Sequence, residues 1–176
     1  MRARIVVLAV MASFACAGQV FHTEESALRI VLKECSSPSR EEKTLQADER
    51  ARLQAETGLR FAQPRYVVYR CPAPDGTGRF AVILEEIGKS EPITFMTGVD
   101  GSGRAGAVVL MIFRESRGSE VKDQRFMGQF RGKTPADPVR VNRDIVNVAG
   151  ASLSSEAIAR GVKMALALVN DCYLKR

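Results

Sequence analysis

The chain has 176 residues, of which 45% are hydrophobic, and its formal net charge is +6. This apolar fraction predicts a packed globular domain and argues against a disordered chain. The basic residues are interleaved with acidic ones and form no stripe with aromatic residues, so the composition also argues against nucleic-acid binding.

The first 17 residues predict an export signal. The segment has two arginines among its first four residues, and residues 5–18 are apolar or small, a run too short to span a bilayer. Ala15-Cys16-Ala17 has the small residues that signal peptidase requires, so we predict cleavage after Ala17. The mature chain of about 159 residues would be periplasmic or otherwise extracytoplasmic, with a charge of +4 after loss of the two arginines. Lipidation of Cys16 is an alternative, although the large Phe14 fits that signal poorly, and only lipidation would give membrane contact.

Residues 18–60 predict an N-terminal helical lobe that forms one globular unit with residues 61–176. Residues 24–34 predict a helix with Thr23 as its N-cap and acidic residues in its first turn. Residues 47–57 predict a second helix, which ends at Gly58.

Four β-strands are predicted in the middle of the chain. They are residues 66–70, 80–86, 93–99 and 107–113, which are rich in β-branched and aromatic residues. The short turns between them predict an antiparallel meander and argue against a Rossmann fold. The last of the four is apolar at every position, so we expect it to be buried on both faces.

The remaining elements predict a helix-covered sheet, and therefore an α+β fold. After a polar loop, residues 122–130 predict a short helix that buries Phe126, Met127 and Phe130. Residues 145–148 predict a short strand, and Ser154 or Ser155 is predicted to begin the last helix. Its buried face is predicted to hold Ile158, Val162, Ala165 and Val169.

Cysteine and histidine are too sparse for several kinds of chemistry. The only histidine is His22, so we expect neither a Ser-His-Asp triad nor a histidine-based metal site. Cys35, Cys71 and Cys172 remain after cleavage and allow at most one disulfide, without a C-x-x-C pair. A thiol-redox or disulfide-stabilised accessory protein is therefore the weaker of two alternative functions.

Residues 150–155 predict the functional site. Gly150 and Ala151 allow a ligand to approach the backbone closely, and Ser152, Ser154 and Ser155 place hydroxyls in the first turn of the last helix. Helix N-termini carry unpaired N–H groups and about half a positive charge. This arrangement suits a phosphate, and the Ser152 hydroxyl is placed where it could be esterified to one.

The run from Asp144 to Ser155 resembles the signature D-x-x-S/T-G-A-T/S-x-T/S-S of the FMN-binding domain family. That family includes flavin subunits of the sodium-pumping NADH:quinone reductase and of the Rnf complex. The resemblance extends over residues 92–169 and includes Glu115 and Gly118, which match a Glu-x-x-Gly loop. It implies an FMN-binding-domain-like fold in residues 61–176. It also implies FMN joined through its phosphate to Ser152 by a magnesium-dependent flavin transferase that uses FAD.

Two positions depart from the signature, because Val146 replaces its acid and Ala149 replaces the hydroxyl residue before the glycine. The function that we predict is an exported FMN-binding electron carrier, with the flavin transferase and an envelope redox protein as partners. The site residues would be Ser152 as anchor, Gly150 and Ala151 at the approach, and Ser154 and Ser155 as donors to phosphate. Because of the two departures, a cofactor-less extracytoplasmic binding module of the same fold is the main alternative.

Overall fold

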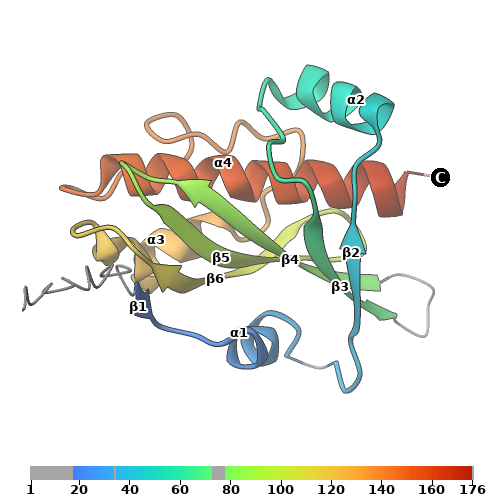
Figure 1. Ribbon diagram of the computed structural model, residues 1–176, viewed down its shortest axis with the longest axis horizontal. Coiled ribbons are helices and arrows are strands. Elements are labelled where there is room, and N and C mark those ends of the chain that lie inside the picture. Colours follow the sequence, from blue (N-terminus) through green and yellow to red (C-terminus); the bar gives the residue numbers. More distant parts are fainter. Residues whose placement is uncertain (1–17, 34, 73–77, 176) are drawn as a thin grey trace, which may run out of the picture.

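The computed structural model describes residues 18–33, 35–72 and 78–175. The predicted signal segment and Cys16 lie outside these residues. The described chain forms one six-stranded sheet in which all neighbouring strands are antiparallel (Figure 1). In spatial order the strands are β1 (Gln19–Val20), β6 (Ala105–Phe113), β5 (Pro92–Val99), β4 (Gly78–Ile87), β3 (Tyr66–Pro72) and β2 (Ser39–Lys43).

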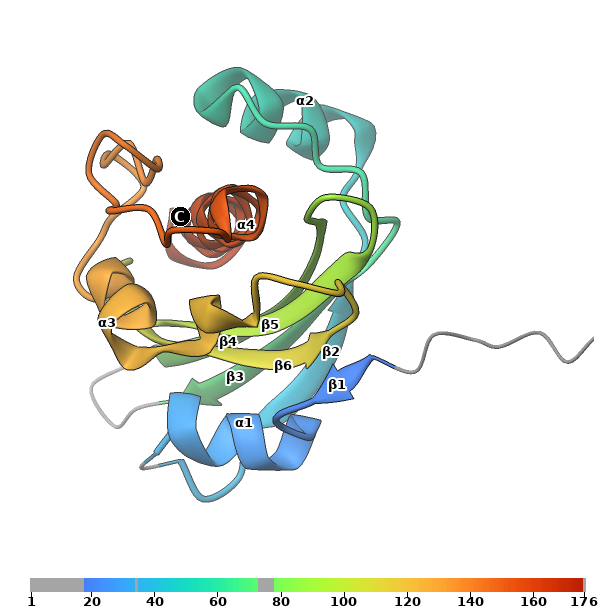
Figure 2. The same cartoon turned by 90° about the vertical axis from the view of Figure 1, so that its left-hand side faces the viewer.

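Helices cover both faces of the sheet, as Figure 2 shows end-on. The long helix α4 (Ser152–Val169) lies on one face, α1 (Glu24–Val31) lies on the other, and α2 (Ala47–Thr57) lies on the α4 side. The predicted α+β class and the predicted meander β3–β6 are therefore confirmed. The buried side chains form two hydrophobic clusters, a large one under α4 and a smaller one under α1.

Helix α4 packs closely on the sheet because one of its residues is a glycine. A Cβ atom on Gly161 would collide with the ring of Phe95 on β5. Both residues are buried, together with Ile158, Val162 and Ala165 on the same helix. The predicted apolar face of the last helix is thus confirmed, and it fixes the position of the helix N-terminus relative to the sheet.

The N-terminal segment, predicted to be helical, also contains two strands that were not predicted. Helix α1 has the predicted cap, since the Thr23 side chain accepts a hydrogen bond from the backbone N–H of Ser26, and α2 ends at Gly58 as predicted. However, β1 pairs with β6 and β2 pairs with β3, so this segment supplies both edges of the sheet. The sequence of β2 has four charged residues and low strand propensity, and pairing with β3 overrides that propensity.

The segment after β6 forms the predicted short helix in three pieces. They are the 3₁₀ turn η1 (Ser119–Lys122), α3 (Gln124–Met127) and the 3₁₀ turn η2 (Gly128–Phe130). Phe126 and Phe130 are buried and pack edge to face at 5.4 Å, which confirms their predicted role in the core. At the end of the chain, η3 (Asn170–Leu174) continues α4 as a π-helical turn.

The strand predicted at residues 145–148 is wrong. In the described chain this segment makes only an isolated bridge, between Val141 and Ile145. The reason is Asp144, whose carboxylate accepts hydrogen bonds from the backbone N–H groups of Val139 and Arg140 at 3.1 and 2.7 Å. These bonds curl the chain into a compact loop, which prevents the segment from extending.

Cys35 and Cys71 form a disulfide that joins the end of the α1 region to β3, and Cys172 is a free, partly buried thiol. One disulfide is the maximum that the sequence predicted. Within the described residues no helix has both the length and the apolar character needed to cross a bilayer. The same residues hold no cluster of three His, Cys, Asp or Glu side chains suited to a metal ion.

Candidate functional site at the N-terminus of α4

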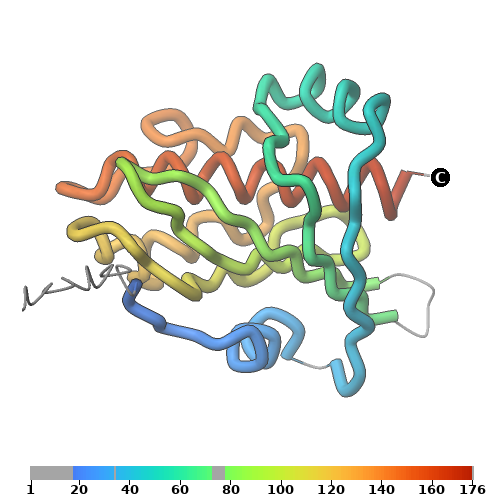
Figure 3. Tube along the Cα trace, in the orientation of Figure 1, coloured from blue at the N-terminus to red at the C-terminus, as the bar shows by residue number. Residues whose placement is uncertain are grey.

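Three segments that are distant in sequence meet at one end of the molecule. They are the turn between β4 and β5, the loop after β6 and the start of α4, which lie together in the trace of Figure 3. They enclose a hollow of about 420 Å³, a size within the range of small-molecule sites. The lining residues are Lys89, Glu115, Ser116, Arg117, Gly150, Ala151, Ser152, Leu153 and Ser154.

Helix α4 begins at Ser152 and not at Ser154 or Ser155, which corrects the predicted helix start. Gly150 has a φ of +79°, and Ala151 is the N-cap. Since alanine has no side-chain acceptor, no side chain caps the first turn of this helix in the described structure. The N–H groups of that turn and the positive end of an 18-residue helix therefore face the hollow.

The Ser152 hydroxyl is exposed at the rim of the hollow, and an asparagine holds it. Its Oγ atom lies 2.6 Å from Nδ2 of Asn147, which donates to it. The other end of that amide, Oδ1 of Asn147, is buried and has no hydrogen-bond partner in the described residues. Because the amide donates, the Ser152 oxygen is oriented while its own proton stays free. Asn147 was not predicted from the sequence, although it lies only five residues upstream of Ser152.

The two following serines take different positions. Ser154 is 4% exposed and lines the hollow, whereas Ser155 is fully buried and does not. The Oγ atom of Ser155 accepts a hydrogen bond from the backbone N–H of Val148 at 3.4 Å. Ser155 thus ties the preceding loop to the helix, and its position does not favour the predicted role as a donor to a ligand.

Gly118 brings the loop after β6 against the first turn of α4. Its φ is +94°, in the left-handed region, and a Cβ atom there would lie 2.9 Å from Oγ of Ser154 and 3.4 Å from Cβ of Ala151. Glycine at this position therefore satisfies both the backbone conformation and the close approach. The predicted pairing of Gly118 with the helix start in one site is consistent with this contact.

Glu115 forms one wall of the hollow by binding the turn between β4 and β5. Its carboxylate accepts hydrogen bonds from the backbone N–H groups of Ser90 and Glu91, at 2.7 and 2.9 Å, and from the Ser90 hydroxyl. Burial opposes ionisation of Glu115, but the backbone N–H donors outweigh it and hold the pKa of the carboxyl below its usual value. Glu115 is thus an anion that fixes the turn, with its oxygens already engaged.

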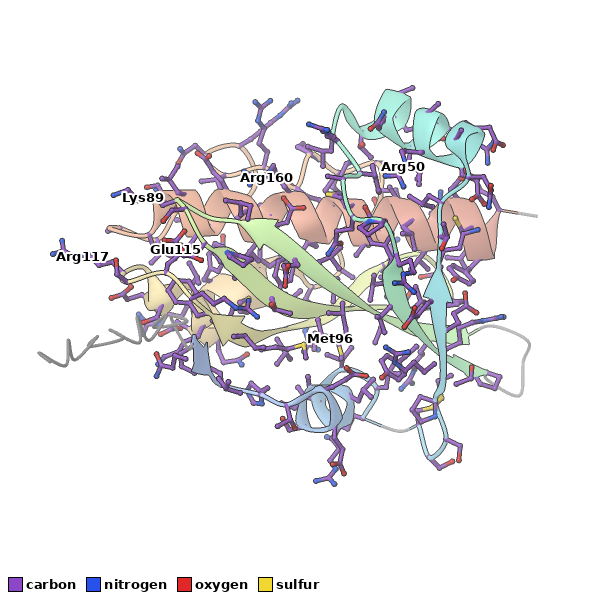
Figure 4. All side chains as sticks on the ribbon, in the orientation of Figure 1. Arg50, Lys89, Met96, Glu115, Arg117 and Arg160 are labelled. Atoms are coloured by element: carbon purple, nitrogen blue, oxygen red, sulfur yellow. A yellow bond between two sulfur atoms is a disulfide. The ribbon has the colours of Figure 1, made fainter. Side chains whose placement is uncertain are left out.

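Two basic side chains complete the hollow, Lys89 from the β4–β5 turn and Arg117 from the loop after β6 (Figure 4). Both are exposed, and they add positive charge beside the helix N-terminus. Lys89 was not predicted from the sequence. Arg114, by contrast, donates to Oγ1 of Thr94 at 2.9 Å and to the carbonyl oxygen of Pro92, so it belongs to the sheet.

Comparisons with known proteins agree with this geometry. Residues 88–167 match the model of the FMN-binding domain family. Among solved structures, the chain resembles one component of the Na(+)-translocating NADH-quinone reductase from Parabacteroides distasonis, with a TM-score of 0.51 and 14% identity. That alignment covers 78% of this chain and 79% of the other. A search of the curated proteins found no match.

The matched segment includes every residue that lines the hollow, from Lys89 to Ser154. The structural likeness confirms the α+β fold predicted from the resemblance. Over residues 88–167 the chain therefore resembles the FMN-binding domain family, and this match supports FMN as the cofactor.

Proposed function

We propose that this protein is an exported electron-transfer flavoprotein that carries FMN through a phosphoester to Ser152. The observation that carries the proposal is the Ser152 hydroxyl, which is exposed on the first residue of α4 and oriented by Asn147 at 2.6 Å. A phosphate joined to this oxygen lies at the positive end of the helix, beside uncapped N–H groups. The chemistry that bound FMN supplies is the reversible uptake of one or two electrons.

The residues of the hollow fit an anion with a bulky organic part. Lys89 and Arg117 provide positive charge, and the side chain of Leu153, which is 49% exposed, provides apolar surface. Glu115 and Gly118 hold the two walls in place through their contacts with the β4–β5 turn and with α4. In this proposal the protein binds, orients and partly desolvates the cofactor, and its charges tune the reduction potential.

Attachment requires a partner enzyme, the flavin transferase. In the proposed transfer the Ser152 Oγ–P bond forms, the pyrophosphate bond of FAD breaks, AMP leaves, and the hydroxyl proton is released. Asn147 leaves that proton free because its amide donates to Oγ. A second partner, a redox protein of the cell envelope, would exchange electrons with the loaded domain after export through the signal segment.

The test is co-expression of the exported protein with a flavin transferase, followed by mass measurement under denaturing conditions. We expect the native chain and Ser152→Thr to retain the mass of one FMN less one water, and Ser152→Ala to lose it. Ser116→Ala, which removes a hydroxyl from another wall of the same hollow, is the matched control and should remain loaded. A fully loaded Ser152→Ala variant would refute the anchor.

A colourless native protein would favour the cofactor-less binding module. The observation behind that alternative is that Val146 is 73% exposed and supplies no acid beside the site. Asp144 does not replace the missing acid, because its carboxylate is engaged by two backbone N–H groups and by Lys133 at 2.9 Å. Restoring the signature with Val146→Asp and Ala149→Ser should then increase flavin loading.

A further inference from the structure

A second and larger hollow lies over α4, between the end of α2 and the loop of residues 138–143. Its volume is about 620 Å³, compared with about 420 Å³ for the hollow beside Ser152. In Figure 2, α2 and this loop flank α4 on the side that faces away from the sheet. No residue is shared between the linings of the two hollows, so they are separate sites on the molecule.

Four basic side chains line this second hollow, and they are Arg140, Arg143, Arg160 and Lys163. Arg160 is paired with Glu86 at 3.3 Å. Lys163 donates to the carbonyl oxygens of Pro135 and Asp137, just before the loop, and forms no ion pair among the described residues, although the carboxylates of Asp137 and Asp144 lie near it. In the described part of the chain, the guanidinium groups of Arg140 and Arg143 have no hydrogen bond or ion pair. These two arginines are therefore available to a ligand.

The acidic residues of the hollow offset only part of this charge. Glu56 forms an ion pair at 2.8 Å with Lys175, which does not line the hollow. Glu156 is exposed and is the one lining carboxylate without an ion pair among the described residues. Arg140, Arg143 and Lys163 form no ion pair among the described residues, whereas only one lining carboxylate is free, so the charges of the lining have a positive balance. Leu59 and Val141 add apolar surface beside these charges.

The loop that carries the two arginines is held in a strained shape. Val139 is buried with a φ of +48°, a left-handed conformation that is unfavourable for a β-branched residue. The Asp144 carboxylate binds the N–H groups of Val139 and Arg140, and the Lys163 ammonium binds the two carbonyl oxygens just before the loop. Strained backbone of this kind persists where the surrounding contacts over-determine it, and it concentrates at ligand clamps.

We propose that the second hollow binds a doubly charged organic anion, a phosphate monoester or a dicarboxylate. The planar guanidinium groups of Arg140 and Arg143 match the oxygens of either group and bind them bidentately. The Lys163 ammonium adds a point charge, and Leu59 and Val141 contact the apolar body of the ligand. This site is distinct from the flavin site at Ser152 and does not depend on the function proposed above.

The experiment is calorimetric titration of the purified protein with phenyl phosphate and with phthalate, at about 0.15 M salt so that non-specific attraction is screened. Phenol is the uncharged control ligand. We expect a dissociation constant of about 1 mM or tighter for at least one of the two anions and no binding of phenol. Phenyl phosphate as the tighter ligand identifies a phosphate-monoester site, and phthalate identifies a dicarboxylate site.

Two double variants locate the binding. Arg140→Ala with Arg143→Ala should weaken binding by about tenfold or more, since charge-assisted hydrogen bonds are lost. Arg125→Ala with Arg131→Ala removes the same charge from two exposed residues outside the hollow and should leave the affinity unchanged. Equal losses in the two double variants, or no binding of either anion, would overturn the proposal.

Each titration is done on protein prepared with and without the flavin transferase. We expect equal affinity in both, because the two hollows share no lining residue. If loading at Ser152 abolishes anion binding, the second hollow is part of the flavin site and the proposal is wrong. If no preparation contains flavin, the function proposed above fails, while the titrations still decide whether the anion site exists.

Discussion

Replacing Gly118 by alanine tests whether the loop after β6 packs directly on the first turn of α4. The new Cβ atom would lie 2.9 Å from Oγ of Ser154, and the φ of +94° is unfavourable for any residue with a side chain. The left-handed backbone costs about 1–2 kcal/mol, and relief of the collision costs about 1–3 kcal/mol more. We therefore expect the free energy of unfolding to fall by about 2–5 kcal/mol.

Two other glycines separate these contributions. Gly150 has a φ of +79° but nothing within 4 Å of its Cβ position, so Gly150→Ala should cost only the backbone part, about 1–2 kcal/mol. Gly128 has a φ of −65° and the same open surroundings, so Gly128→Ala should be neutral or stabilising by up to about 1 kcal/mol.

Urea unfolding followed by far-UV circular dichroism measures these differences, since the chain has no tryptophan for fluorescence. The midpoint should fall in the order Gly128→Ala, Gly150→Ala, Gly118→Ala, with the dependence on urea unchanged. If Gly118→Ala unfolds at the same urea concentration as Gly150→Ala, the loop does not press on α4. The loop after β6 would then not form a wall of the hollow at the start of α4.

Three further predictions concern contacts that support the site and the sheet. Burial raises the pKa of the Asp144 carboxyl, but the backbone N–H groups and Lys133 outweigh burial, so the pKa in the folded state is below its usual value. The ionised carboxylate therefore stabilises the fold above about pH 4, and this stabilisation is lost as the pH falls through the pKa of the folded state. Asp144→Asn should therefore unfold about 1–2 kcal/mol more easily at neutral pH and show a flatter acid titration by circular dichroism; an unchanged slope would contradict this. Replacing Cys35 and Cys71 by serine opens a crosslink across 36 residues and should cost about 4 kcal/mol in thermal or urea unfolding, whereas Cys172→Ser should cost much less. Glu115→Gln removes the charge that binds the β4–β5 turn, so the free energy of unfolding should fall by about 1 kcal/mol. Amide hydrogen exchange in that turn should become faster, and unchanged exchange would show that Glu115 does not support the turn.

The centre of the sheet was predictable from local patterns. Strands β3 to β6 have β-branched and aromatic runs separated by short turns, and this pattern predicts an antiparallel meander. Strand β2 was not predictable, because four of its five residues are charged. It is extended because it pairs with β3, and this pairing is not visible in its own sequence. The strand predicted at residues 145–148 was wrong for the opposite reason. Its sequence favours a strand, but the Asp144 carboxylate binds the neighbouring backbone and bends the chain.

The part of the site contained in one stretch of sequence was also predictable. Gly150 to Ser154 lie together at the start of α4, and the resemblance to a known signature identified Ser152 among them. Lys89 was missed because it is more than 60 residues upstream, and only the antiparallel topology brings the β4–β5 turn to this end. Ser155 was assigned to the ligand because hydroxyls at a helix start suit anions, but helix geometry turns it inward.

The charged residues of β2 lie on an edge strand of the sheet, where they affect how the sheet meets other molecules. An apolar strand at the border of a sheet exposes unpaired N–H and C=O groups that can recruit another molecule. Here β3 and β6 are shielded by β2 and β1, the first highly charged and the second only two residues long. Strands β1 and β2 thus protect the sheet from strand-by-strand association, and this protection explains why β2 has a sequence with so little intrinsic tendency to form a strand.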